Sequence, residues 1–308
     1  MHSILFSLGN FPIRSFGFSI AIGLIVVYFV IARLARRENI PPDFASNIIS
    51  VAMLSGLIGA RAAYVMEHWT SHYAAHPGAA FRIWDGGLMF YGGFILAFAV
   101  ILIYIRFAKL RLWTVLDILA VALPLGHAFG RIGCFLNGCC YGRVVDTIGC
   151  GAFERSIAVI FPKDSIPFNG QVNDDLIFDT AQNSLPVLPA QLIESAANFA
   201  IFALLLALAL LVRTRPGFRT GLYMALYAIV RFFVENLRSD PRIHFGVFSV
   251  SQTISLILLP IGALLILLSF FRAREEPQTQ DDPHIPPPPP NISRPRARMA
   301  DVFDKHRK

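Results

Sequence analysis

The sequence predicts an all-α polytopic membrane protein with about seven transmembrane helices. Its 308 residues are 55% hydrophobic and only 15% charged, and the mean hydropathy is +0.57. A helix needs about 20 mostly apolar residues to cross the bilayer core. An open sheet cannot cross, because its edge groups would have no hydrogen-bond partner in lipid. Long apolar runs therefore predict helices, and they cover 16–32, 45–60, 86–105, 112–130, 195–212, 220–237 and 243–271.

These runs differ in how well they fit a membrane helix. The first, third, fifth and seventh contain no Asp, Glu, Lys or Arg. The run at 45–60 is short, and the run at 112–130 is interrupted by Asp117. The run at 220–237 is the weakest, because Arg231 and Glu235 fall within it.

Basic residues gather in alternate loops, whereas the loop between the second and third runs carries only Arg82 besides Arg61, which lies at the end of the second run. The positive-inside rule then places the N-terminus outside and the C-terminus in the cytoplasm, which requires an odd number of spans. This alternation also explains the net charge of +7 without a nucleic-acid partner. The first run lacks a basic start and a cleavage site, so we expect it to stay rather than be removed as a signal peptide. The basic residues after the odd-numbered runs are Arg33, Arg36, Arg37, Arg106, Lys109, Arg111, Arg213, Arg215, Arg219, Arg272 and Arg274.

Composition divides the chain into a membrane-embedded body and a tail. We expect the body to cover 1–271, with a small extracytoplasmic insert at 141–189 between the fourth and fifth spans. The segment 272–308 is polar and includes five consecutive prolines at 286–290. It predicts a disordered, Pro-rich cytoplasmic tail with a polyproline II segment.

The fourth run ends in a segment that combines arginines with glycines. Arg131 lies at or inside the membrane boundary, and Arg143 closes a segment that contains four glycines, at 130, 133, 138 and 142. An arginine in hydrocarbon is costly, and glycines let the backbone approach a ligand closely. An anionic ligand at the membrane surface explains both features.

The sixth run carries a polar stripe. Tyr227, Arg231, Glu235 and Arg238 are spaced by four, four and three residues, so they share one helix face. Such a stripe faces a cavity or other charges rather than lipid. The alternative is an Arg231–Glu235 pair that only packs helices, with Arg238 reaching the headgroups.

Other candidates lie near the predicted outer surface. Arg61 ends the second run and either reaches a site or snorkels to headgroups. Tyr91 lies between two glycine pairs, where it is either a site hydroxyl or an interface aromatic. Gln191 and Glu194 are three residues apart on one face of the fifth helix, which is also compatible with a solvated helix start. Three histidines at 68, 72 and 76 fit a solvated loop better than a metal face, because no acid or cysteine completes the set.

The four cysteines cluster in sequence at 134, 139, 140 and 150. Three interpretations remain open. They form a metal site whose spacing is unlike that of zinc ribbons, or a disulfide joins Cys150 to Cys139 or Cys140. In the third, they are small buried thiols beside glycines.

Several motifs in this order resemble the prolipoprotein diacylglyceryl transferase family, over about 16–271. They are Arg61 with Tyr64, Asp-Gly-Gly-x-x-Phe-x-Gly-Gly at 85–93, Gly-Arg-Ile-Gly-x-Phe-x-Asn-Gly-x-x-x-Gly-Arg at 130–143, Pro-x-Gln-Leu-x-Glu at 189–194, and Arg-x-x-x-Glu-x-x-Arg at 231–238. The resemblance implies transfer of the diacylglyceryl group of phosphatidylglycerol to the lipobox cysteine sulfur of a prolipoprotein, with release of glycerol phosphate. That reaction is the first step of lipoprotein maturation in the bacterial inner membrane.

The resemblance also implies roles for residues. Arg131 binds the lipid phosphate, Arg231 is the second essential arginine, and Tyr91 and Glu235 complete the catalytic set. Two guanidinium groups suit the charge that develops on a departing phosphate, so we expect no cofactor and no metal. The residues predicted to bind phosphatidylglycerol are Arg61, Arg131, Gly133, Asn137, Gly138, Arg143, Gln191, Glu194 and Arg238.

The chain departs from the family pattern near this site. Cys134 stands where Asn is common, Cys139 where Glu is common, and Tyr91 where His is frequent. A Tyr of ordinary pKa is a poor base at neutral pH, which leaves Glu194 and Glu235 as carboxylate candidates. The alternative functions are a relative that binds phosphatidylglycerol without transfer, and a transporter with an anion site, although the halves show no inverted repeat. The further departures are Phe16 for Tyr, Leu188 for His and Ile193 for Tyr.

Overall fold

The computed structural model describes residues 4–8, 11–145, 150–239 and 244–272. The predicted disordered tail, 272–308, lies outside these residues except for Arg272. Within the described residues, long helices form the body and the strands form two short antiparallel hairpins. The hairpin strands are β1 (Ile4–Leu8) with β2 (Phe11–Arg14), and β3 (His244–Phe245) with β4 (Phe248–Ser249).

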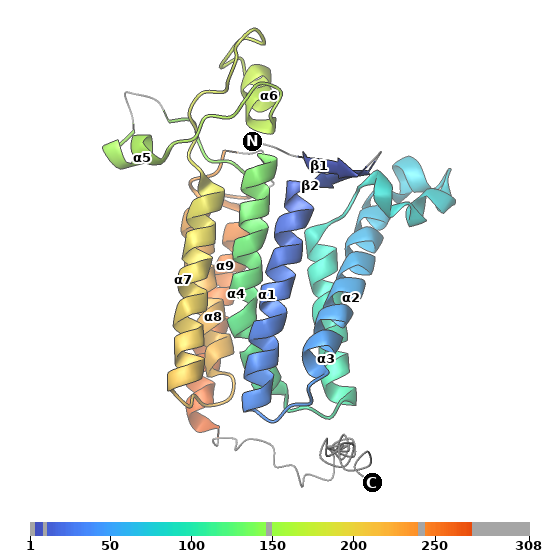
Figure 1. The fold of residues 1–308 in the computed structure, drawn as a ribbon, viewed down its shortest axis with the longest axis vertical. Helices are drawn as coiled ribbons and strands as arrows, with labels where there is room; N and C mark the ends of the chain where they lie inside the picture. The colour runs from blue at the N-terminus through green and yellow to red at the C-terminus, as the bar shows by residue number, and fades with distance from the viewer. Residues whose placement is uncertain (1–3, 9–10, 146–149, 240–243, 273–308) are drawn as a thin grey trace, which may run out of the picture. The chain divides into compact units, whose positions relative to one another are not determined.

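Seven long helices run side by side among the described residues (Figure 1). Six of them are long and apolar enough to cross a membrane, which confirms the predicted all-α polytopic class. The exception is α8, which contains Arg219, Arg231 and Glu235 and corresponds to the weakest predicted run. The helices are α1 (Ser15–Arg37), α2 (Phe44–Glu67), α3 (Phe90–Phe107), α4 (Leu112–Asn137), α7 (Ala190–Leu211), α8 (Phe218–Glu235) and α9 (Val250–Phe271).

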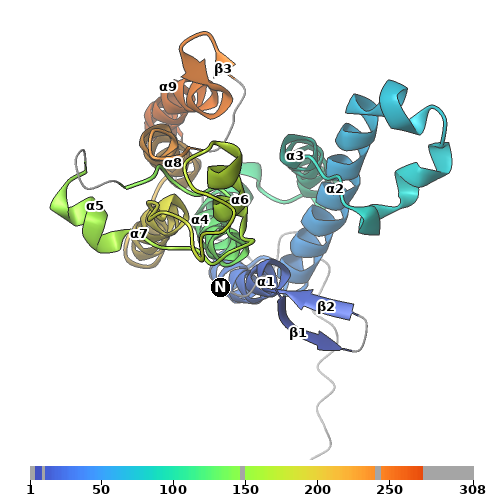
Figure 2. The ribbon, with the colours of Figure 1, turned by 90° about the horizontal axis from the view of Figure 1, so that it is seen from above.

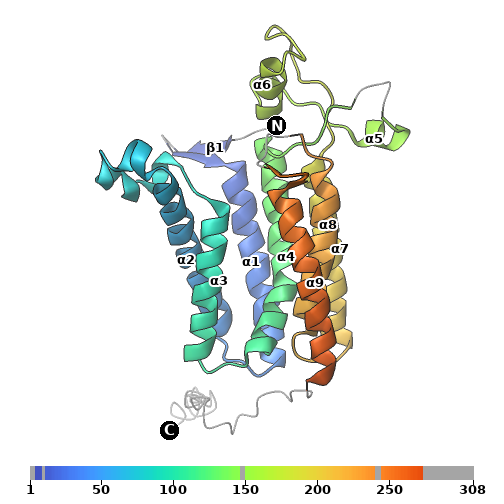
Figure 3. The ribbon, with the colours of Figure 1, turned by 180° about the vertical axis from the view of Figure 1, so that it is seen from behind.

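Successive long helices alternate in direction, so α1 begins at the upper end of the bundle in Figure 1 and α9 ends at the lower end. Figure 3 shows the same alternation from behind. The basic ends of the helices meet at the lower end, where Arg36 and Arg37 close α1 and Arg106 closes α3. The helix α8 must be counted to give this odd number of passes.

Glycines allow pairs of helices to approach closely. A Cβ added to Gly59 of α2 would lie 2.5 Å from the Gly92 carbonyl oxygen of α3. A Cβ added to Gly221 of α8 would lie 2.7 Å from the Gly262 carbonyl oxygen of α9. Small residues at such contacts are typical of membrane helix packing, which depends on van der Waals contact. Seen from above, α2 with α3 and α8 with α9 form two separate close pairs (Figure 2).

Asp117, which interrupts the fourth predicted run, ties α4 to the start of α8. Its Oδ2 accepts a hydrogen bond from the Gly217 backbone N–H at 2.9 Å. Its Oδ1 accepts from the backbone N–H and the hydroxyl of Thr220 at 2.8 and 2.7 Å. The two backbone N–H groups are among the unpaired donors of a helix start. The carboxylate therefore stabilises a helix start that offers no side-chain cap of its own.

The segment between α4 and α7 lies at the upper end of the bundle and contains two short helices (Figure 1). They are α5 (Ala152–Ile157) and α6 (Ile166–Asn173). Main-chain hydrogen bonds close the base of this segment: Gly142 N–H donates to Leu188 O at 2.9 Å and Arg143 N–H to Leu237 O at 2.9 Å. These bonds join the end of α4 to the start of α7 and the end of α8. Irregular turns also fill the α2–α3 connection, namely a π-helical turn at Trp69–Tyr73 and 3-10 turns at Pro77–Phe81 and Ile83–Asp85.

Candidate functional site

Three helices bring two arginines, two glutamates and a histidine together in the upper half of the bundle. His127 and Arg131 lie one turn apart on α4, Glu194 lies in the first turns of α7, and Arg231 and Glu235 lie one turn apart on α8. We call these five residues the ion cluster. Charges within membrane helices are costly unless they are paired with one another, and the two arginines and two glutamates of this cluster are paired.

Glu194 is the centre of the ion cluster. Its Oε1 lies 3.1 Å from Arg131 Nη2 and 3.4 Å from His127 Nε2. Its Oε2 lies 3.5 Å from Arg231 Nη1. Glu194 is only 1% exposed, so the alternative of a solvated helix start is wrong. A single buried carboxylate thus holds the two arginines that the sequence predicted as essential.

Arg231 is fixed from its other side by α8 and α9. Its Nη2 lies 2.8 Å from Glu235 Oε2 and donates to Ser251 Oγ at 2.8 Å. Glu235 Oε1 in turn accepts from Ser249 Oγ at 2.7 Å. The predicted Arg231–Glu235 pair is therefore real, but it also continues into Glu194 instead of only packing helices.

The ion cluster retains hydrogen-bonding capacity. Among the described residues, Arg131 Nε and Arg231 Nη1 are buried and make no hydrogen bond, although Nη1 lies near Glu194. Buried donors are rarely left unpaired. Two arginines with donors to spare form a site suited to an anion with several oxygens, such as a phosphate.

The predicted residues at the end of α4 surround this cluster in different ways. Asn137 is the last residue of α4 and hydrogen-bonds the Cys139 thiol. Gly138 takes φ +81°, the left-handed conformation that ends many helices. Gly133 is buried against α1, where an added Cβ would lie 2.9 Å from Phe16 Cδ2. Gly133 therefore serves close helix packing in this structure.

Three other predicted site residues lie outside the ion cluster and interact with its neighbours or with Arg131. Gln191 is buried, and its Nε2 donates to the Cys139 carbonyl at 2.8 Å. Tyr91 is half-exposed on α3 but interacts electrostatically with Tyr227, whose ring packs 5.4 Å from that of His127. Arg238 interacts electrostatically with Arg131.

Two predicted arginines are engaged elsewhere. Arg61 donates to the carbonyl oxygens of Ala79, Ala80 and Gly86 at 2.8, 2.8 and 2.6 Å. It is 7% exposed, so it fixes the α2–α3 connection and does not snorkel. Arg143 is half-exposed and lies 2.5 Å from Glu154, whose pKa its hydrogen bond lowers.

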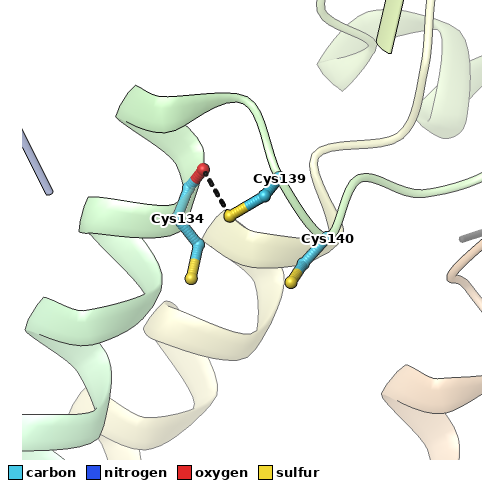
Figure 4. Close-up of side chains that lie close together, drawn as sticks. All are labelled: Cys134, Cys139 and Cys140. Carbon is cyan, nitrogen blue, oxygen red and sulfur yellow. Dashed lines mark hydrogen bonds between the residues drawn. The ribbon is translucent and has the colours of Figure 1, made fainter. Parts of the chain in front are cut away.

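Three of the four cysteines converge (Figure 4), and two of them, Cys134 and Cys140, interact electrostatically with Arg131 of the ion cluster. The sulfur atoms of Cys134, Cys139 and Cys140 all lie within 4.8 Å of one another. All four cysteines are free thiols, so neither considered disulfide to Cys150 is formed. Hydrogen bonds from Cys134 and Cys139, and then the charges of Arg238 and Arg131, lower the pKa of Cys140.

Sequence reasoning missed His127. It lies in the fourth run, four residues before Arg131, and a histidine inside an apolar run was the available signal. It also missed the groups that orient the charges. Besides Ser249 and Ser251, Asn198 is fully buried and donates to the Glu194 carbonyl at 2.8 Å.

Comparison with known proteins points in one direction. The family described as prolipoprotein diacylglyceryl transferase matches residues 3–268. A phosphatidylglycerol–prolipoprotein diacylglyceryl transferase 2 of Clostridium perfringens is 30% identical over 90% of this chain and 98% of its own. Phosphatidylglycerol–prolipoprotein diacylglyceryl transferases of Finegoldia magna and Streptococcus pneumoniae serotype 4 are 32% and 31% identical, each over 86% of this chain and 94% and 92% of their own.

Proposed function

The chain belongs to the prolipoprotein diacylglyceryl transferase family, and from that premise we propose that the ion cluster is its active site. The chain is a membrane transferase that moves the diacylglyceryl group of phosphatidylglycerol to prolipoproteins in lipoprotein maturation. The acceptor is the thiol of the lipobox cysteine. The membrane is the bacterial inner membrane, with the N-terminus outside and the C-terminus in the cytoplasm.

The observation that carries this assignment is the pair of buried arginines with unused donors. The thiol sulfur forms a bond to the glyceryl carbon, and the bond from that carbon to the phosphate oxygen breaks. Glycerol 1-phosphate leaves with the electron pair, so negative charge develops on its oxygens. Arg131 Nε and Arg231 Nη1 have no hydrogen-bond partner among the described residues. They are available to that charge, and fixed donors of this kind stabilise a transition state by several kcal/mol.

The remaining residues of the ion cluster then have distinct roles. Glu235 positions Arg231, because it is held by Ser249 and holds the guanidinium at 2.8 Å. Glu194 sets the separation of the two arginines. His127 and Glu194 offer proton-accepting atoms beside Arg131. Tyr91 lies at the edge and contacts substrate rather than acting as the base.

Substrate binding extends beyond the ion cluster. Arg238 adds positive charge for the phosphate. Asn137, Gly138 and Gln191 shape the wall at the end of α4, with Gly133 packing that wall against α1. Arg143 supplies charge on the insert, and Arg61 acts by holding the α2–α3 connection in place.

The test is transfer in reconstituted vesicles. Phosphatidylglycerol labelled in its diacylglyceryl group is supplied with a lipobox peptide, and label on the peptide is measured. Arg131→Ala and Arg231→Ala each lose transfer, by about 100-fold or more, whereas the exposed Arg33→Ala retains it. Unchanged transfer in both active-site variants would show that the ion cluster is not the active site.

A further inference from the structure

The convergence of three thiols beside Arg131 has no role in the chemistry above. Cys134 lies on α4 three residues after Arg131, so the two share a helix face. Cys139 and Cys140 return to that face because the chain reverses at Gly138, which has φ +81°. All three thiols are half-buried, so they are accessible to a ligand from the site.

The backbone at Cys140 shows that this convergence carries a cost. Cys140 takes φ +61°, a left-handed conformation that side chains with a Cβ seldom adopt outside Asn and Asp. Such positions cost about 1 kcal/mol or more. A turn with Cys140 at negative φ would not have this free-energy cost. The conformation found instead brings the Cys140 sulfur within 4.8 Å of the other two.

We propose that Cys134, Cys139 and Cys140 bind one zinc ion, and that its fourth coordination position takes the thiol of the prolipoprotein cysteine. Zinc–thiolate bonds of about 2.3 Å in tetrahedral geometry place sulfur atoms about 3.8 Å apart. The thiols need only close from a separation of at most 4.8 Å. Thiolate ligands select zinc or copper(I) over harder ions.

Three protein ligands and one open position are the pattern of catalytic rather than structural zinc sites. A thiol that coordinates zinc is deprotonated. Zinc therefore provides a route to the thiolate besides the proton-accepting atoms of His127 and Glu194, and this role rests on the proposed function. The negative charge of the thiolates that zinc does not balance also meets positive charge, because Arg131 and Arg238 both interact electrostatically with Cys140.

The reaction step balances without an added redox partner. The prolipoprotein thiol binds zinc and releases its proton to solvent. The zinc-bound sulfur then forms the carbon–sulfur bond, the carbon–oxygen bond to phosphate breaks, and the oxygen keeps the electron pair. The thioether product is a weaker ligand than a thiolate, so it leaves the metal.

Metal analysis of the full chain in lipid nanodiscs tests the site itself. Zinc content is expected at about one per chain in the wild type and near zero in Cys134→Ser and Cys140→Ser. Cys150→Ser is the matched control, because Cys150 lies outside the three-thiol group, and it retains zinc. Equal zinc in the wild type and Cys134→Ser, or a disulfide within the group in wild-type protein, overturns the proposal.

A spectroscopic experiment on the wild type tests the fourth position and does not depend on variants that fold. Cobalt(II) replaces zinc, and its ligand-field spectrum is recorded as a lipobox peptide is added. A cysteine-containing peptide shifts the spectrum and a peptide with serine at that position does not. An identical response to the two peptides overturns the role of the fourth position.

Transfer measured in parallel separates the two proposals. Removal of zinc by a chelator is expected to lower transfer by about 100-fold or more, with recovery on adding zinc. Full transfer by metal-free protein overturns the zinc proposal while leaving the arginine assignment intact. Full zinc binding together with unchanged transfer in Arg131→Ala and Arg231→Ala overturns the proposed active site instead.

Discussion

At the scale of single residues, Glu194 is the group on which the other charges of the site depend. Its two oxygens contact Arg131, His127 and Arg231 from two other helices. Its sequence signals are the spacing of three residues from Gln191 and its place in the Pro-x-Gln-Leu-x-Glu motif at 189–194, and neither indicates that it meets both arginines. A buried carboxylate without a cationic partner destabilises the fold. Removing Glu194 would likewise leave Arg131 and Arg231 as buried charges without this partner.

Replacing Glu194 with Gln is expected to lower transfer by about 100-fold. The amide keeps the size of the side chain but removes the charge that sets the positions of Arg131 and Arg231. The matched control is Glu67→Gln, an exposed residue at the end of α2, which retains full transfer. The vesicle transfer assay measures both, and equal activity in the two variants would contradict this role.

The sequence predicted part of the site because helical spacing is regular. The stripe of Tyr227, Arg231 and Glu235 follows from spacing alone, and its contacts confirm that Arg231 and Glu235 pair. Which residue of another helix the stripe meets does not follow from spacing. The link from Arg231 to Glu194 and then to His127 depends on how α4, α7 and α8 pack. The convergence of the cysteines depends likewise on a turn at Gly138.

At the scale of elements, the boundaries differ from the predicted runs for identifiable reasons. The third run was expected to begin at Gly86, but α3 begins at Phe90 because Gly86 and Gly87 take φ +83° and +77°. The helix α2 extends to Glu67, seven residues beyond the predicted end at 60. Its extra turns pass Arg61, whose bonds to the following loop were not visible in the sequence.

The tie from α4 to α8 predicts a stability effect. Asp117→Ala removes the acceptor for three donors of the α8 start, and we expect a loss of about 3 kcal/mol of unfolding free energy. Asp117→Asn keeps one acceptor oxygen and loses less. Thermal unfolding in detergent measures both, with the exposed Asp43→Ala as control. An Asp117→Ala protein as stable as that control would contradict the tie.

The glycine contact between α2 and α3 predicts another effect. Gly92→Val places a side chain against Ala63 and the Gly59 backbone, where there is no space for it. The helices must separate, and we expect a loss of about 2 kcal/mol or more. Gly17→Ala in α1 is the control, because an added Cβ there meets nothing within 4 Å. The ratio of folded to aggregated protein after heating measures the difference, and equal ratios would show that the contact is not tight.

At the scale of the whole molecule, the alternating direction of the helices decides which loops lie on the same side of the membrane. The ends of α1 and α3 that carry Arg36, Arg37 and Arg106 lie at one end of the bundle (Figure 1). The ion cluster lies near the end of α4, the start of α7 and the end of α8, which are at the other end. Composition predicted the class, whereas the odd number of passes stays a prediction, because six of the described helices are long and apolar enough to cross a membrane. Composition could not show that α8, with its three charged residues, runs alongside the apolar helices. A charged helix is stable there only when its charges meet partners on other helices, as Arg231 meets Glu194.

Reporter fusions test this orientation in cells. Alkaline phosphatase, which is active only outside the cytoplasm, is expected to be active when fused after Asp174 in the insert. It is expected to be inactive after Glu38 and after Lys109, which lie in loops at the basic end. A green fluorescent protein at the same positions gives the opposite pattern. Phosphatase activity after Glu38 would reverse the assignment.

The hydrogen bonds at the base of the insert have one further consequence. Gly142, Arg143, Leu188 and Leu237 are joined through backbone N–H and carbonyl groups only. Among these positions Gly142 must stay a glycine, because an added Cβ would lie 2.7 Å from both Leu188 O and Leu237 O, whereas main-chain bonds place no such demand on the exposed side chains of the insert. The exposed surface of the insert can therefore vary while the ends of α4, α7 and α8 stay in register.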